Sequence, residues 1–198
     1  SIYSGHLLDL RRFIPIISTP LFLFHSLICL VTMSAILVFV TLAPGWLITE
    51  LGGSVSDFTF WFTCNAVLSI VASFIMPLYI KRQPKRALKA GLLLLVISGV
   101  LMLALNQQRT ALALMFPMFI AAFGFALTLG SSAGRALSMF SKQAGTASAL
   151  IGVMQMSGAS LLVFLTQFLN LTTPSLIGVH FLLLIPFAYL LFRYKQLS

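Results

Sequence analysis

Residues 81–105 read KRQPKRALKAGLLLLVISGVLMLAL, a basic cluster followed by an apolar run. An α-helix rises about 1.5 Å per residue, so about 20 apolar residues cross the hydrocarbon core of a bilayer, which is about 30 Å thick. Lys and Arg are enriched on the cytoplasmic side of membrane-spanning helices. The stretch therefore predicts a transmembrane helix over about 87–105, whose N-terminal end faces the cytoplasm.

Five further apolar runs of similar length lie along the chain. In hydrocarbon every backbone amide must be hydrogen-bonded internally, and a helix achieves this within one segment. Short loops join the runs, so consecutive helices are expected to be antiparallel. The sequence therefore predicts an all-α membrane protein, a six-transmembrane-helix bundle. Its helices are expected at about 20–44, 58–80, 87–105, 111–133, 146–168 and 175–192.

The composition excludes an ordinary soluble domain. Of the 198 residues, 60% are hydrophobic and 8% are charged, whereas soluble domains are about 25% charged. The net charge of +9 would indicate nucleic-acid binding in a soluble protein. Here the basic residues lie in short loops between apolar runs, so topology explains them. We therefore predict the lipid bilayer, and not a nucleic acid, as a partner.

The distribution of Lys and Arg supports all six spans at once. With a cytoplasmic N-terminus, only Arg109 falls on the outer side of the membrane, together with the acidic Glu50 and Asp57. The predicted cytoplasmic side carries Arg11, Arg12, Lys81, Arg82, Lys85, Arg86, Lys89, Arg135, Lys142, Arg193 and Lys195. We therefore predict a cytoplasmic lead-in segment over 1–19, a transmembrane domain over 20–198, and cytoplasmic N- and C-termini.

Polar residues deep in the predicted helices are few. The amides of Asn65 and Gln155 cost free energy in lipid unless they face protein or water. Two interpretations stay open, namely hydrogen bonding between helices and a cavity that binds substrate. Met and aromatic residues near them are equally typical of helix packing. On the second interpretation, the candidate substrate-binding residues are Met33, Thr41, Trp61, Asn65 and Gln155.

Two helix faces are distinguished by their small residues. Small residues spaced by four let a neighbouring helix approach closely. The fourth predicted helix carries Ala122, Ala126, Gly130 and Gly134. The fifth predicted helix carries Ser148, Gly152, Gln155 and Ala159, a face that is too polar for lipid.

No pattern in the sequence predicts an enzyme, a cofactor or a metal site. The two cysteines lie in apolar runs, and no metal-ligand spacing or nucleotide-binding glycine pattern is present. One enzymatic alternative pairs Ser132 with His180, as in intramembrane serine proteases of the rhomboid type. The predicted topology places these residues near opposite ends of their helices, roughly 20 Å apart. A nucleophile and its base need about 3 Å, so this alternative is rejected.

Two stretches carry a family resemblance. Around the first outer loop the chain has Ala43-Pro44, Glu50, Gly52-Gly53, Phe58 to Phe62, and Asn65-Ala66. The fifth predicted helix opens with Ala144-Gly145-Thr146-Ala147-Ser148-Ala149-Leu150, and Gln155 follows. Over about 11–195 the chain resembles the C-terminal half of a major facilitator superfamily transporter, in particular the Bcr/CflA-type drug:proton antiporters.

This resemblance implies a twelve-helix transporter made of two six-helix halves around a central cavity. The chain would supply helices seven to twelve of a proton-coupled multidrug efflux transporter in the bacterial inner membrane, which works by alternating access. The implied partners are a lipophilic small molecule, protons and an N-terminal six-helix half. The family's cytoplasmic-loop signature, antiporter motif and first-helix acid belong to that half, and residues 81–86 lack an acid. Proton coupling is therefore expected mainly in the other half.

Two other functions stay open at this stage. The chain begins with Ser1 and has no signal-peptide pattern, so we expect it to be part of a longer protein. Alternatively, a free-standing six-helix protein oligomerises as a channel or carrier, or the protein has a structural role. A stable homodimer with transport activity would favour a channel or carrier, and a lack of solute flux would favour a structural role.

Overall fold

The computed structural model describes residues 13–194 and 197, and within them it contains helices and no strand. The elements, in chain order, are α1 (Ile14–Ile17), α2 (Pro20–Pro44), the π-helix η2 (Gly45–Glu50), α3 (Val55–Arg82), α4 (Pro84–Leu105), the short η3 (Asn106–Gln108), α5 (Ala111–Ser138), the short η4 (Ser141–Gln143), α6 (Ala144–Val153), the π-helix η5 (Met154–Gly158), α7 (Ala159–Gln167), α8 (Thr173–Leu182) and α9 (Ile185–Arg193).

Several of these elements join into six membrane-length spans of 21 to 31 residues. This confirms the predicted all-α six-helix membrane bundle. The spans run past most of the predicted bounds because apolar content marks only the part inside hydrocarbon. For example, α3 begins at a capping box, in which Ser54 Oγ accepts from the Asp57 amide at 3.0 Å and Asp57 Oδ2 accepts from the Ser54 amide at 3.0 Å. Such polar caps satisfy free amides at a helix start.

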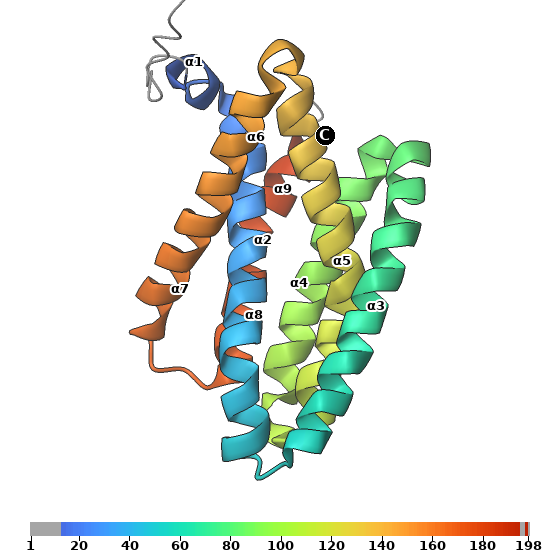
Figure 1. The fold of residues 1–198 in the computed structure, drawn as a ribbon, viewed down its shortest axis with the longest axis vertical. Helices are drawn as coiled ribbons and strands as arrows, with labels where there is room; N and C mark the ends of the chain where they lie inside the picture. The colour runs from blue at the N-terminus through green and yellow to red at the C-terminus, as the bar shows by residue number, and fades with distance from the viewer. Residues whose placement is uncertain (1–12, 195–196, 198) are drawn as a thin grey trace, which may run out of the picture.

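Two central helices, α2 and α5, organise the bundle (Figure 1). Helix α3 packs on α5, η5 and α7 pack along α2, and α6 contacts α5. Helix α4 makes the most extensive contact with α5 and also packs on α8. The molecule therefore has two flanks, α3 on one side and α6–η5–α7 on the other, joined by a well-packed centre.

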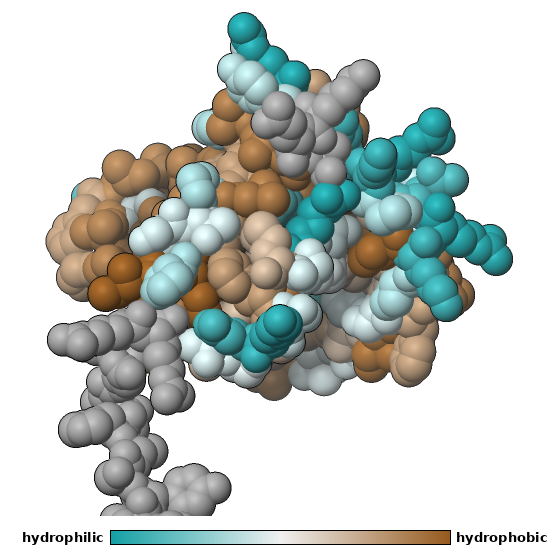
Figure 2. Space-filling view, turned by 90° about the horizontal axis from the view of Figure 1, so that it is seen from above, coloured by the Kyte–Doolittle hydropathy of each residue, from teal (hydrophilic) through white to brown (hydrophobic). Residues whose placement is uncertain are grey.

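The charged residues sort to the two ends of the bundle. At the end that carries α1 and the C-terminus of α9, the basic side chains are exposed or half-buried (Figures 1 and 2). We call this the basic end; its described cations are Lys81, Arg82, Lys85, Arg86, Lys89, Arg135, Lys142 and Arg193. Figure 2 shows hydrophilic side chains gathered there on the α3–α4 side, with mostly hydrophobic ones over α6. The opposite end, called the acidic end, carries Glu50, Asp57 and Arg109. Arg11, Arg12, Lys195 and residues 1–12 of the predicted lead-in lie outside the described residues.

Helix α4 reaches its neighbours through glycines. A Cβ on Gly91 would lie 2.5 Å from Thr128 Oγ1 and 2.9 Å from the Thr128 backbone nitrogen on α5. A Cβ on Gly99 would lie 2.7 Å from Phe181 Cβ on α8. Only hydrogen fits at either position, so the two helices approach the α4 backbone as closely as sterics allow.

The small-residue face predicted on the fourth helix has a different role. A Cβ on Gly134 would meet nothing within 4 Å, and one on Gly130 would touch only the tip of Ile80 at 3.0 Å. Ala122 and Ala126 line a hollow. The close approach expected for this face is therefore absent at Gly134, whereas at Gly130 the side chain of Ile80 on α3 lies near. Helix α3 does pack on α5, but beside these small residues it leaves a hollow.

We predict that Gly91→Ala destabilises the bundle by about 1–3 kcal/mol, the usual cost of overpacking a well-filled contact. The matched control is Gly134→Ala, which adds the same methyl group to open space and is expected to be neutral or slightly stabilising. Thermal unfolding of the purified protein in detergent measures both. Equal midpoints for the two variants would contradict the close α4–α5 contact.

Candidate functional site

The two flanks of the bundle are far less buried than its centre. Only 6% of the most apolar stretch of α3 and 17% of that of the α6–η5–α7 span is buried, against 56% for the α2 and α5 spans. The α3 flank carries the polar residues Asn65, Ser69 and Ser73 in its transmembrane part. The exposed middle of α4, in contrast, is apolar, with Leu93, Ile97 and Val100. The surface of α4 thus suits lipid. Helix α3 also exposes apolar side chains, among them Val67, Ile70 and Phe74, so only its face with Asn65, Ser69 and Ser73 is unsuited to lipid.

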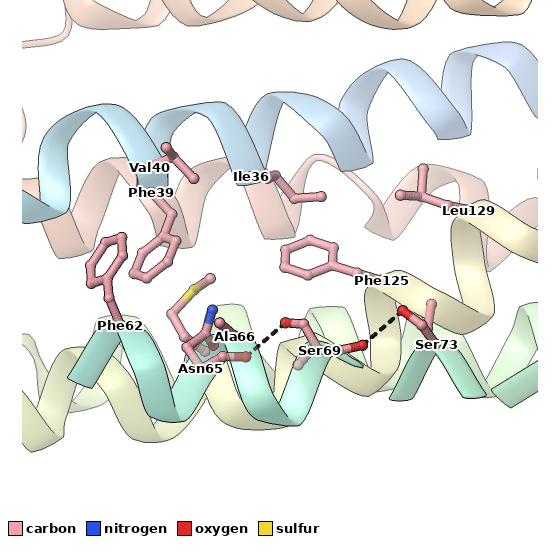
Figure 3. A pocket seen from close by; sticks show the side chains of 13 residues that line it. Ile36, Phe39, Val40, Phe62, Asn65, Ala66, Ser69, Ser73, Phe125 and Leu129 are labelled. Atoms are coloured by element: carbon pink, nitrogen blue, oxygen red, sulfur yellow. Dashed lines mark hydrogen bonds between the residues drawn. The ribbon is translucent and has the colours of Figure 1, made fainter. Parts of the chain in front are cut away.

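A hollow of about 510 Å³ lies between α2, α3 and α5 (Figure 3). No charged residue lines it. Its walls come from Ile36, Phe39 and Val40 of α2, from Phe62, Asn65, Ala66, Ser69 and Ser73 of α3, and from Met118, Ala122, Phe125, Ala126 and Leu129 of α5. Its size falls in the range of small-molecule sites, which are mostly apolar with a few placed polar groups.

Asn65 supplies the free polar group of this hollow. Ser69 Oγ donates to the backbone carbonyl oxygen of Asn65 at 2.8 Å, and Ser73 Oγ donates to the backbone carbonyl oxygen of Ser69 at 2.8 Å. Both hydroxyl protons are therefore used within α3. Asn65 Oδ1 is buried and has no hydrogen-bond partner among the described residues. Figure 3 shows the amide nitrogen of Asn65 pointing into the hollow. A buried amide without a partner is costly, so this side chain is suited to bind a ligand or water.

Aromatic rings form one end of the hollow. Phe39 and Phe62 are stacked with their ring centroids 4.9 Å apart and an interplanar angle of 10°. Phe58 packs against Phe62 with the two ring centroids 4.3 Å apart. Phe125 enters from α5 (Figure 3). Such flat apolar walls favour a planar or lipophilic ligand, because ring faces offer contact area at little entropic cost.

The structure does not bring all five predicted substrate residues into this hollow. Asn65 lines it. Trp61, one turn away, lines a second hollow of about 220 Å³ at the acidic end, beside Arg109. Met33 is half-buried and Thr41 is exposed on α2, and Gln155 is half-buried on η5. These last three are not among the residues that line the 510 Å³ hollow.

Gln155 lies in a π-helical segment that the sequence analysis did not foresee. The segment Met154–Gly158 widens the helix between α6 and α7. Because a π turn holds an additional residue, it rotates the residues on either side relative to one another. The face predicted from α-helical spacing is split accordingly, with Ser148 and Gly152 exposed and Ala159 buried. Such π segments are frequent at functional sites.

Most of the residues that line the hollow were not predicted from the sequence. A signal was present on the second predicted helix, where Asn65, Ser69 and Ser73 are four residues apart and share one face. The residues from α2 and α5 are ordinary apolar residues, and their part in the hollow depends on the distance between helices. That distance follows from tertiary packing, which no local pattern contains.

Both ring nitrogens of His180 have hydrogen-bond partners, one within α8 and one on α7. Its Nδ1 lies 2.8 Å from the Leu176 carbonyl oxygen, and its Nε2 lies 3.2 Å from Thr166 Oγ1. Ser132 is buried and has no hydrogen-bond partner among the described residues. The Ser132–His180 dyad, rejected on grounds of depth, is therefore not assembled. Within residues 13–194 and 197, no three metal-ligating side chains come together either.

The chain is similar to bacterial proteins named Multidrug resistance protein MdtL. It is 28% identical over 159 residues to the protein of Klebsiella pneumoniae (strain 342), covering 80% of this chain and 40% of the relative. It is 30% identical over 152 residues to the proteins of Salmonella paratyphi A and Salmonella newport (strain SL254), covering 75% of this chain and 37% of each relative. The chain thus spans about two fifths of the length of these curated relatives. No protein-family model and no solved structure matches it.

We predict that water reaches the hollow but not the middle of α4. With Cys29 and Cys64 replaced by Ala, a Ser69→Cys variant should react with a small water-soluble methanethiosulfonate at least about tenfold faster than an Ile97→Cys variant, because the reactive thiolate forms only where water is present. Ile97 is the matched control, since it is exposed on the apolar face of α4. Equal rates would mean that both surfaces face lipid.

Proposed function

We propose that this chain is the C-terminal six-helix half of a proton-coupled multidrug efflux transporter in the bacterial inner membrane, of the Bcr/CflA-type within the major facilitator superfamily. It moves lipophilic small molecules across the bilayer by alternating access. The observation that carries this proposal is the largely apolar hollow with the unpaired Asn65 amide, on a little-buried flank of the bundle.

Lipid is a poor cover for this flank. Hydrocarbon offers no hydrogen bond to the Asn65 amide, and burying an unpaired amide in an apolar medium costs about 1–3 kcal/mol or more. A second protein body would enclose the hollow and keep water in it. The uncovered flanks α3 and α6–η5–α7 lie on either side of α2 and α5, so an N-terminal half seated across them encloses both.

The comparisons support the same arrangement. The relatives are named for multidrug resistance, and this chain aligns with about two fifths of their length. That share fits one half of a protein built from two similar halves. Under this proposal the basic end faces the cytoplasm, because Lys and Arg gather there, and both chain ends lie on that side.

The lining of the hollow indicates how a drug is held. Aromatic and aliphatic walls bind lipophilic molecules by burying apolar surface, at about 25 cal/mol per Å². Asn65 adds one hydrogen bond that orients the ligand. Because no charged residue lines the hollow, proton coupling and any charge on the drug are handled by the other half. Met33, Thr41, Trp61 and Gln155 remain proposed contacts for a drug on its way along the cavity.

We predict that the complete protein raises the inhibitory concentration of lipophilic drugs at least fourfold in cells that lack their own efflux pumps, whereas this chain expressed alone does not. The reason is that one half cannot present the cavity alternately to the two sides of the membrane. Immunoblots of the membrane fraction control for expression. Full resistance from the chain alone, with a purified homodimer, would establish the free-standing carrier instead.

We further predict that Asn65→Leu in the complete protein weakens drug binding about fivefold and lowers drug resistance accordingly. A fivefold loss of affinity corresponds to one lost hydrogen bond of about 1 kcal/mol. Gln155→Leu should lower resistance as well. The matched control is Ser69→Ala, which changes the same hollow but removes a hydroxyl that donates within α3, so its effect should stay within twofold. Unchanged resistance in either Leu variant removes that residue from the proposed site.

A further inference from the structure

We infer that an anionic phospholipid binds the outer face of α4 and α9 at the basic end, with its phosphate held by Arg86, Lys89 and Arg193. This site lies away from the hollow, which opens on the α3 side of the bundle. It would give the bundle a bound lipid that takes no part in drug transport.

The cations of α4 stand above an apolar strip on their own helix. Arg86, Lys89, Leu93, Ile97 and Val100 are spaced by three or four residues, so they share one face of α4. Leu93, Ile97 and Val100 are 44%, 48% and 53% exposed. The same helix face therefore offers positive charge at the membrane surface and exposed apolar side chains deeper in the membrane.

Helix α9 completes the site from beside α4. The Lys89 ammonium lies 5.2 Å from the centre of the Phe192 ring, which fixes the two helices side by side at this level. Arg193 follows Phe192, and its Nη1 donates to the Tyr189 hydroxyl at 2.8 Å. The ring of Phe192 and the side chain of Ile185 are 52% and 45% exposed. The three cations thus come from two adjacent helices whose outer faces are both apolar.

Nothing among the described residues neutralises these charges. The acidic residues of the described chain are Glu50 and Asp57, and both lie at the acidic end, where Glu50 pairs with Arg109 at 3.7 Å. Clustered cations without acids need anions, and basic sites between transmembrane helices on the cytoplasmic side are typical for anionic headgroups. A phospholipid satisfies both halves of the surface, since its phosphate meets the cations and its acyl chains lie along Leu93, Ile97 and Ile185.

The test uses the complete purified protein in detergent, titrated with phosphatidylglycerol or phosphatidylcholine and analysed by native mass spectrometry. The test variant is Arg86→Gln/Lys89→Gln/Arg193→Gln. The matched control, Lys81→Gln/Arg82→Gln/Lys142→Gln, removes the same charge from the same end of the bundle. We expect the wild type to bind one phosphatidylglycerol at least tenfold more tightly than phosphatidylcholine. The test variant should lose this preference, and the control should keep it within twofold.

Two results would overturn the proposal. One is equal binding of both lipids by the wild type, and the other is equal loss of phosphatidylglycerol in the two triple variants, which would indicate a non-specific charge effect. If the triple test variant does not stay folded, the single variants decide. Lys89→Gln should weaken phosphatidylglycerol binding at least threefold, and Lys142→Gln should leave it unchanged; similar behaviour of the two single variants would also overturn the site.

Discussion

Hydrogen bonding of the backbone inside hydrocarbon is the constraint on which this structure depends. Each amide within the spans must find its partner in the same segment, so the chain forms six helices and places its caps and charges at their ends. What remains to be decided is how closely the helices approach. Glycines on α4, at Gly91 and Gly99, bring α5 and α8 into tight contact and fix the centre of the bundle.

Tight packing at the centre leaves the flanks open, and function follows from what the flanks carry. Helix α4 turns an apolar surface outward, whereas α3 carries Asn65 and two serines beside a hollow. Because the serine hydroxyls bond within their own helix, the polarity of the hollow reduces to one amide among aromatic walls. Under the proposed function, such a site would bind many lipophilic molecules with little discrimination. The relatives' names agree with that property.

The sequence was sufficient to predict the fold class and the number of membrane spans. Both follow from local patterns, namely apolar runs of hydrocarbon length and the sorting of cations to the helix ends. The sequence also singled out Asn65, which lines the hollow, since an amide in an apolar run stands out. It did not identify Phe125 or Met118, whose place in the hollow depends on how far α3 stands from α5. The face around Gln155 was misjudged for a related reason, since the π turn at Met154–Gly158 rotates it and has no clear sequence signal.

The central claim is that protein, and not lipid, covers the α3 flank. Cryo-electron microscopy of the complete protein in lipid nanodiscs measures this directly. We expect a second six-helix body to close over Asn65 and Ser69, with ordered acyl chains against Leu93 and Ile97 of α4. Acyl chains packed against Asn65 and Ser69, with no protein facing them, would contradict the account.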